Sequence, residues 1–463
     1  MEFKREFFGK TISEKCIKRS QKHVDFFKKK IAQKDEKRYY FQTAENENGN
    51  FVYGITELVL SEKVSKINSK RAVFIIYSGL DTTSARNGQI TAEAFAAQGY
   101  KVYVFDATRD KNSSAGKLII YYEKLKRKNK VVLENLPTLG KIFVKSEFRS
   151  AMKIEKSYLN SEIAKVMSDV FINVPAEIPV IACDAMLATA CREAGVAKVY
   201  NLIDDTEIFG ENLSEKAINI VQVLSSYLKY RIIEKGVKIP EESIIDTGYL
   251  IDNSSFENIE SDCNKRFERI KTKERKRVFV DFENIENSHI EKVCESLLKN
   301  VNFGESKLYI NFGSKNGIRR KIMKKYSEHT LNIGLDNKVI SYSEIEDKNP
   351  EDKRILCFGE NNKFLNSFIV NEIIRNSDFA ICGLGPLVSA PVPKIVLANN
   401  KTSTRIENKE INICAVNFEE LKDIVNLITT EENILKTMIK NVIKCKKTGM
   451  YNGIINLTGK IFE

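Results

Sequence analysis

Short apolar runs alternate along this chain with longer amphipathic stretches. Ala72–Tyr77, Lys101–Phe105, Arg277–Phe282 and Lys307–Phe312 are largely apolar runs, as expected for strands buried on both faces of a sheet. Between the first two runs, Gln89–Gln98 has the spacing of a helix and is followed by a glycine. Strands and helices that alternate in this way predict an α/β fold with doubly wound parallel sheets.

The alternation occurs twice, on either side of an almost wholly polar stretch. We therefore expect two Rossmann-like domains of similar size, with a helical pair after the second one. The expected parts are a basic N-terminal segment 1–70 that begins as a helix, a first Rossmann-like (acceptor-side) domain 71–251, a linker 252–276, a second Rossmann-like (donor-side) domain 277–417, and C-terminal helices with a tail 418–463. Further expected elements are strands at Lys141–Val144 and Lys338–Ser341 and a helix at Ala217–Glu234.

A glycine turn stands between two of the predicted strands. Phe379–Cys382 leads into Gly383-Leu384-Gly385, and a short helix that begins at Pro386 precedes the next apolar run. Glycines at such a turn let a ligand approach the backbone, and the free N–H groups of the helix start attract anions. The dinucleotide fingerprint is incomplete, since Val388 stands where its third glycine would be. An ordinary turn with nothing bound explains the pattern equally well.

Charge and composition narrow the class of protein. The 463 residues carry 74 Lys and Arg against 62 Asp and Glu, a net charge of +12 that favours anionic partners. A lysine-rich solvated surface is the plainer explanation. Nine cysteines without a close pair and three separate histidines predict reduced thiols and no structural metal site. We expect a cytoplasmic protein, at most peripheral to the inner face of the membrane, because no stretch is long and apolar enough to span it.

The two-domain pattern resembles the GT-B glycosyltransferase superfamily, distantly its lipid-linked N-acetylglucosaminyltransferases and galactolipid synthases. The loop Ser78–Gly88 after the first buried strand is similar to the acceptor-side glycine loop. Asp246–Leu250, with Phe256 after it, looks like the strand and aromatic hinge that close the first domain. Asp378–Gly383 and the Pro-led strand Pro391–Val396 resemble the donor-diphosphate segment. The resemblance implies two Rossmann-like sheets that face a cleft, and transfer of a sugar from a nucleotide-sugar, such as a UDP-sugar, to a hydroxyl acceptor.

On this hypothesis the donor diphosphate is bound beside the glycine turn. Main-chain N–H groups of Gly383, Leu384 and Gly385 would bind it, while Lys315, Arg319 and Lys394 neutralise its charge. A solvated helix start is the alternative for Lys315 and Arg319. No cofactor or metal is required. The segment from Leu384 to Ala390 contains no carboxylate, whereas the family usually has there a Glu that binds the ribose.

Two residues of the first loop are the catalytic candidates. Asp81 would deprotonate the acceptor hydroxyl, and Arg86 would orient an anionic acceptor through a bidentate contact. The family often has a histidine base in this loop, and this chain has none. A residue that caps the turn is the alternative role for Asp81.

Three hypotheses therefore remain open. The first is a hexosyltransferase, or an epimerase on the same scaffold, with a glycan or lipid-linked acceptor. The second is a non-catalytic relative that binds a nucleotide or a glycan. The third is a basic binder of nucleic acid or of an anionic membrane surface; nucleic acid is not expected as a partner under the first two.

Overall fold

The structure is a computed structural model. It describes residues 6–7, 10–11, 39–47, 50–58, 71–108, 116–117, 119–121, 161, 163–165, 167–168, 171, 175–203, 217–221, 241–283, 285, 287–300, 306–334, 341–359, 363–383, 386–397 and 411–462.

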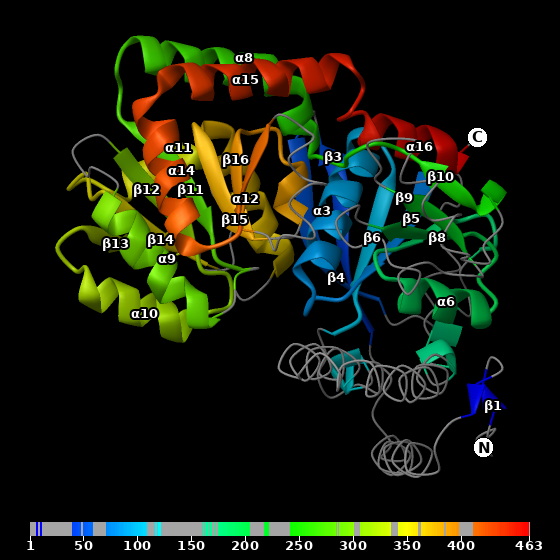
Figure 1. The fold of residues 1–463 in the computed structure, drawn as a ribbon. Helices are drawn as coiled ribbons and strands as arrows, with labels where there is room; N and C mark the ends of the chain where they lie inside the picture. The colour runs from blue at the N-terminus through cyan, green and yellow to red at the C-terminus, as the bar shows by residue number, and fades with distance from the viewer. Residues whose placement is uncertain are drawn as a thin grey trace. The chain divides into compact units, whose positions relative to one another are not determined.

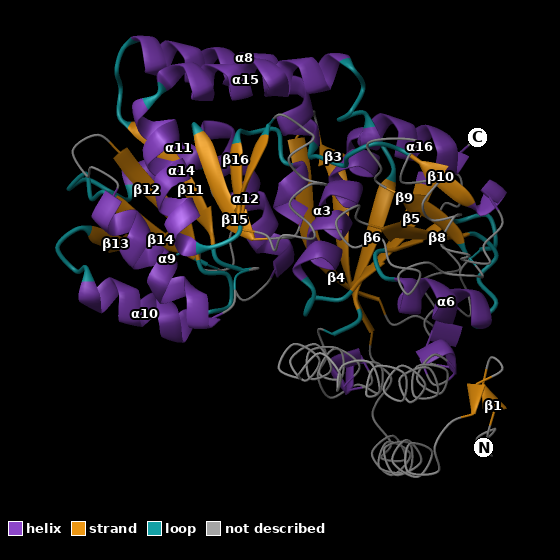
Figure 2. Cartoon of the chain, in the orientation of Figure 1, coloured by secondary structure: helices purple, strands orange, loops and turns teal. Residues whose placement is uncertain are grey.

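The chain divides into two compact units, and neither is a single stretch of sequence. The first comprises 1–80, 96–202 and 211–219, and the second comprises 81–95, 203–210 and 220–463. Figure 1 shows the elements of the described residues by label, and Figure 2 shows them by type.

Eight described strands form the first sheet, in the order β10-β9-β8-β7-β5-β6-β3-β4. Their bounds are β3 Tyr39–Glu47, β4 Asn50–Leu58, β5 Ala72–Tyr77, β6 Lys101–Asp106, β7 Val180–Ala182, β8 Val199–Ile203, β9 Ile218–Val221 and β10 Ile244–Asp246. The chain also forms α3 Thr82–Ala97 and α6 Ala185–Glu193. Strand β5 is parallel to β6 on one side and to β7 on the other. The chain thus winds away from β5 in both directions, which confirms the doubly wound sheet expected from the alternation.

The expected N-terminal helix is wrong where the structure describes this segment. β1 Glu6–Phe7 pairs with β2 Lys10–Thr11 as antiparallel strands, and residues 12–38 lie outside the described residues. Strands β3 and β4 then form a hairpin that joins β6 in antiparallel orientation. Asn48-Gly49 separates the paired residues Glu47 and Asn50, and this dipeptide is the most typical sequence of a two-residue hairpin loop.

Other expected elements also differ from the structure. The predicted helix at Ala217–Glu234 is wrong at its start, where β9 runs instead and buries Asn219 and Ile220 completely. A short apolar run does not distinguish a strand from a buried helix, which accounts for the error. The strand predicted at Lys141–Val144 and the first three residues of the one ending at Ser341 lie outside the described residues.

Seven parallel strands form the second sheet, in the order β13-β14-β12-β11-β15-β16-β17. Their bounds are β11 Lys276–Asp281, β12 Ser306–Asn311, β13 Thr330–Asn332, β14 Ile355–Phe358, β15 Phe379–Gly383, β16 Lys394–Leu397 and β17 Asn412–Ala415. The helices that accompany them are α9 Asn287–Asn300, α10 Asn316–Lys325, α11 Tyr342–Asp347, α12 Lys363–Asn376 and α14 Phe418–Thr430. Short 3-10 turns lie at Glu241–Ser243 and Pro386–Ser389.

Helices cover both faces of this second sheet. Val278 of β11 belongs to a core cluster with residues of α9 and α14, whereas its neighbour Phe279 belongs to a cluster with residues of α11 and α12. Successive side chains of a strand point to opposite faces, so the two clusters are the two sides of one three-layer unit. This arrangement confirms the second Rossmann-like sheet.

The polar stretch 252–276, expected as a linker whose second half is helical, forms one long helix over most of its length, α8 Asn253–Lys271. Ile259, Cys263 and Ile270 recur at helical spacing and join the core of the second unit. Helix α8 packs along α15 Glu432–Lys447, and the two lie side by side in Figure 1. A last helix, α16 Gly453–Phe462, ends the chain. The high polarity that suggested a linker belongs to the outward face of an amphipathic helix.

Candidate functional site

The strand order of the second sheet defines where a ligand of such a fold binds. From β11 the chain moves outward through β12, β13 and β14, and it returns to the other side of β11 as β15. In open α/β sheets, ligands bind outside the carboxyl ends of the strands at this reversal. Asp281 ends β11 and pairs with Cys382, one residue before the end of β15 at Gly383. The loops that follow Asp281 and Gly383 therefore border the candidate site.

Asp281 is a buried acid at the end of an otherwise apolar strand. Its side chain is 2% exposed, and Oδ1 accepts hydrogen bonds from Asn311 Nδ2 at 2.7 Å and from the main-chain N of Glu283 at 3.3 Å. Burial raises the pKa of Asp281 to about 7, and the charge of Glu283 acts in the same direction. Asp281 thus exchanges its proton near neutral pH.

Gly313 makes room for the carboxyl group of Glu283, and Gly359 makes room for the main chain of Gly313. Gly313 has φ +52°, and a Cβ there would lie 2.8 Å from Glu283 Cδ. A Cβ at Gly359 would lie 2.5 Å from the main-chain oxygen of Gly313. Both contacts are too short for any other residue. From α12, Asn366 Nδ2 donates a hydrogen bond of 3.2 Å to Glu283 Oε2.

Two of the predicted cations lie at this same edge of the sheet. Lys315 Nζ donates to the main-chain oxygens of Phe282, at 2.7 Å, and of Ile285. Arg319 Nη1 donates to the main-chain oxygen of Gly359 at 3.2 Å. Lys315 also precedes α10 at its N-cap position, where it makes no side-chain capping bond. The two cations hold the loops after β11 and β14 at the start of α10.

The glycine turn itself is described only at its beginning. Gly383 pairs with Leu397 at the end of β15, while Leu384 and Gly385 lie outside the described residues. The short helix predicted after the turn is the 3-10 turn Pro386–Ser389. Anion binding by the main chain at this turn therefore stays a prediction.

Lys394 lies away from this edge, contrary to its expected place beside the donor. It is the first residue of β16, whereas Leu397 is the last, and it is fully buried. Its Nζ donates to the main-chain oxygens of Ala390 and, at 2.8 Å, of Val392. Burial lowers the pKa of Lys394 to about 7. The ammonium holds the segment before β16, because its donors face carbonyls of that segment.

Of the two catalytic candidates, Asp81 directly precedes α3 and Arg86 lies near the start of that helix. Asp81 Oδ1 accepts a hydrogen bond of 3.0 Å from the main-chain N of Thr83, which is the turn-capping role considered as the alternative. Arg86 is 3% exposed. Its charge is one of those that lower the pKa of the Cys382 thiol, although burial raises that pKa to about 12. Arg86 thus lies near β15, and a catalytic role for either residue stays a prediction.

The polar side chains at the carboxyl edge were not predicted from the sequence. Asp281 and Asn311 were included in apolar runs, and Glu283 and Asn366 were not considered. The sequence did contain a signal. In each of the runs Arg277–Phe282 and Lys307–Phe312, the next-to-last residue is polar and the last is a phenylalanine. Polar residues at the carboxyl ends of neighbouring parallel strands meet at one edge.

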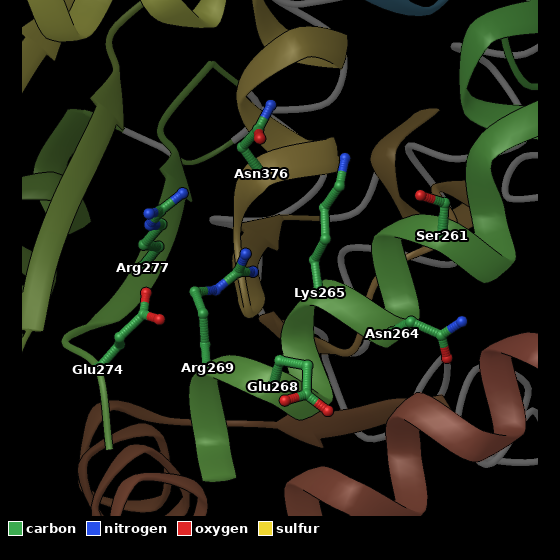
Figure 3. A pocket seen from close by; sticks show the side chains of 8 residues that line it. All are labelled: Ser261, Asn264, Lys265, Glu268, Arg269, Glu274, Arg277 and Asn376. Atoms are coloured by element: carbon green, nitrogen blue, oxygen red, sulfur yellow. The ribbon is translucent and has the colours of Figure 1, made fainter. Parts of the chain in front are cut away.

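A groove lies elsewhere on the same unit, near the start of β11. This groove, of about 760 Å³, is lined by eight polar or charged residues: Ser261, Asn264, Lys265, Glu268, Arg269, Glu274, Arg277 and Asn376 (Figure 3). Its most buried cation, Arg269, already forms a salt bridge of 2.7 Å with Asp378. We therefore place the candidate site at the carboxyl edge.

The described residues give no support for a metal site or for a membrane-spanning helix. Those residues contain no group of three His, Cys, Asp or Glu side chains that could hold a metal ion. None of the helices described there has the length and apolar character needed to cross a bilayer.

Fold and site define a protein with two Rossmann-like sheets, the second of which carries a polar site where its strand order reverses. Two family models match the chain, and both are described as domains of unknown function: DUF6937 over residues 6–232 and DUF6938 over residues 239–459. No curated protein matches it.

Several solved structures are similar to the chain at low identity. A co-structure of S. aureus MnaA with UDP has a TM-score of 0.49 at 12% identity and covers 84% of this chain and 94% of its own. UDP-GlcNAc 2-epimerase from Neisseria meningitidis, bound to UDP-GlcNAc, has a TM-score of 0.48 at 10% identity, covering 84% and 99%. A glycosyltransferase from Rickettsia africae has a TM-score of 0.44 at 13% identity, covering 85% and 99%.

Proposed function

We propose that this protein binds a nucleotide-sugar at the carboxyl edge of its second sheet, as a GT-B-like protein. The observation that carries the proposal is the coincidence of the strand-order reversal between β11 and β15 with a cluster of polar and basic side chains. Ligands bind at this place in doubly wound sheets. A nucleotide-sugar combines anionic phosphates with many hydroxyls, and the edge offers both cations and hydrogen-bond acceptors.

The diphosphate would lie between the glycine turn and the start of α10. Main-chain N–H groups from Gly383 to Gly385 would donate to it, together with the guanidinium of Arg319. A guanidinium carries several N–H donors, so the bond to Gly359 leaves Arg319 further capacity for an anion. Lys315 would contribute its positive charge while it holds the loop after β11.

The finer proposal is transfer of the sugar to a hydroxyl acceptor in glycan or glycolipid synthesis. Asp81 would take the proton of the acceptor hydroxyl, the acceptor oxygen would bond to the anomeric carbon, and the nucleoside diphosphate would leave with the electron pair of the broken bond. Arg86 would orient the acceptor, which requires its buried guanidinium to become accessible. Association with an anionic membrane surface stays a prediction beside this one.

A second candidate function is binding of the nucleotide-sugar without catalysis. Two observations favour it. The carboxylate of Asp81 is engaged in capping the start of α3, and the sequence from Leu384 to Ala390 contains no carboxylate.

Titration calorimetry with UDP, UDP-glucose and UDP-GlcNAc tests the binding proposal. We expect Arg319→Ala to weaken binding roughly tenfold or more, because a hydrogen bond to a charged group is lost. Arg320→Ala is the matched control, since Arg320 is the exposed neighbour on the same helix, and it should change the affinity less than about twofold. Absence of binding by all three ligands would overturn the proposal. Salt-dependent binding to oligonucleotides in that case would favour the basic-binder hypothesis.

Release of UDP from a UDP-sugar distinguishes the two functions. The transfer proposal predicts release by the wild-type protein and a loss of about a hundredfold or more in Asp81→Asn. Unchanged release in that variant would exclude Asp81 as the base. Tight binding without any release would establish the non-catalytic alternative.

A further inference from the structure

We propose that Glu283 and Asn366 accept hydrogen bonds from two adjacent hydroxyls of the nucleotide-sugar. The loop after β11 would thus take the hydroxyl-bearing part of the ligand, while the phosphates lie towards α10. This inference rests on the proposed function, and it assigns a role to two side chains for which the transfer hypothesis has none.

The side-chain oxygen of Asn366 has no hydrogen-bond donor within the described residues. The Asn366 side chain is 2% exposed, and its Nδ2 already donates to Glu283 Oε2. A buried carbonyl oxygen without a donor destabilises a fold. A ligand hydroxyl beside Glu283 would satisfy it, because a hydroxyl donates one hydrogen bond and accepts others.

The chemistry of this corner selects hydroxyls over the other parts of the ligand. A phosphate has only acceptors and a negative charge, so the carboxylate of Glu283 would repel it. A ligand ammonium would meet the positive charge of Lys315, which holds the same loop. A hydroxyl is neutral and donates, and an ionised carboxylate is the strongest acceptor in the side-chain inventory.

The carboxyl group of Glu283 is fixed in place before any ligand arrives. Gly313 leaves the space that it occupies, and Lys315 secures the loop that carries it. Acceptors that are already ordered lose little conformational freedom on binding. Two acceptors held side by side, one carboxylate oxygen and one amide oxygen, suit two neighbouring hydroxyls of one sugar ring.

The sugar ring could be the ribose or the transferred hexose, and ligand pairs distinguish them. Titration calorimetry on the full chain would compare UDP with 2′,3′-dideoxy-UDP, and UDP-glucose with UDP. We expect Glu283→Gln to lose roughly tenfold to a hundredfold in affinity for the ligand that carries the recognised hydroxyls. Asn366→Ala should lose several-fold for the same ligand. Glu328→Gln is the control, because it removes an equal charge from an exposed position.

Each outcome has a defined meaning. If the preference for UDP over its dideoxy analogue disappears in Glu283→Gln, the ribose hydroxyls are the ones bound. If instead the preference for UDP-glucose over UDP disappears, they belong to the hexose. Equal affinities of wild type and both variants for all ligands would overturn this inference and leave the proposed function standing. No binding of any ligand by the wild type would overturn both. Thermal unfolding of the variants separates lost contacts from lost folding, and Asn366→Ala keeps the test available if Glu283→Gln does not fold.

Discussion

Asp281→Asn should stabilise the protein clearly more at pH 8 than at pH 5. In the folded chain, burial raises the pKa of Asp281 from its ordinary value of 3.8 to about 7. The folded state therefore binds more protons than the unfolded state between about pH 4 and pH 7. Stability falls as pH rises through this window, and the loss is complete above pH 7.

The size of the effect follows from the two pKa values. The difference between 3.8 and about 7 corresponds to about 4 kcal/mol, which is the upper limit of what the neutral variant recovers at pH 8. Asparagine has nearly the same shape and keeps an oxygen that can accept from Asn311 Nδ2 and from the main-chain N of Glu283. At pH 5 the unfolded chain is already ionised at this carboxyl while the folded chain is still protonated, so only roughly a third of this loss has occurred and the substitution recovers correspondingly less.

Differential scanning calorimetry at pH 5 and pH 8 measures this difference. The quantity to compare is the change in unfolding temperature between variant and wild type at each pH, so that other titrating groups cancel. Glu328→Gln, which removes an exposed carboxylate, should show no such pH dependence. An equal effect of Asp281→Asn at both pH values would refute the argument that the buried acid is protonated near neutrality.

Other predictions concern contacts inside each of the two units. Arg266→Leu should cost about 3 kcal/mol or more in unfolding free energy, because the buried guanidinium donates to three main-chain oxygens at the end of α12; Arg266→Lys should recover part of the loss in the same thermal unfolding experiment. Gly79→Ala should cost about 2 kcal/mol, since its Cβ would lie 2.4 Å from a carboxylate oxygen of Asp106. Gly317→Ala meets no atom within 4 Å at a position without a positive φ and should cost less, and an equal cost would contradict the steric argument. Lys394→Met should be less unfavourable at pH 7 than at pH 10, since it leaves the main-chain oxygens of Ala390 and Val392 without a donor at both pH values. Burial lowers the pKa of Lys394 from 10.5 to about 7, so the wild type recovers stability as pH rises between these values, and unfolding at both pH values tests the sign.

The parallel strands could be predicted because runs that are apolar at every position are typical of strands buried on both faces. Ala72–Tyr77 is apolar at every position, and all six residues are buried in β5. An apolar run predicted the wrong element where the run was short. Ile218–Val221 fits a strand or a helix, and only its pairing in the sheet decided for a strand. The polarity of α8 misled in another way, because a helix packed along one face keeps most of its residues polar.

The candidate site was predicted in part. Lys315 and Arg319 lie at the expected edge because a basic helix start after a strand has to emerge there in a parallel sheet. The place of Lys394 was wrong, since a lysine at the beginning of a strand lies at the other edge. Glu283 and Asn366 are 83 residues apart, and local patterns carry no information about such a contact.

The cysteines offer a way to follow the two units separately. All eight that the structure describes are free and buried, with Cys183 and Cys191 in the first unit and the other six in the second. A thiol reagent therefore has to wait for a local opening before it can react, so the labelling rate of each cysteine reports how often its surroundings open. Mass spectrometry of partly labelled protein would show which unit opens first, without any added probe.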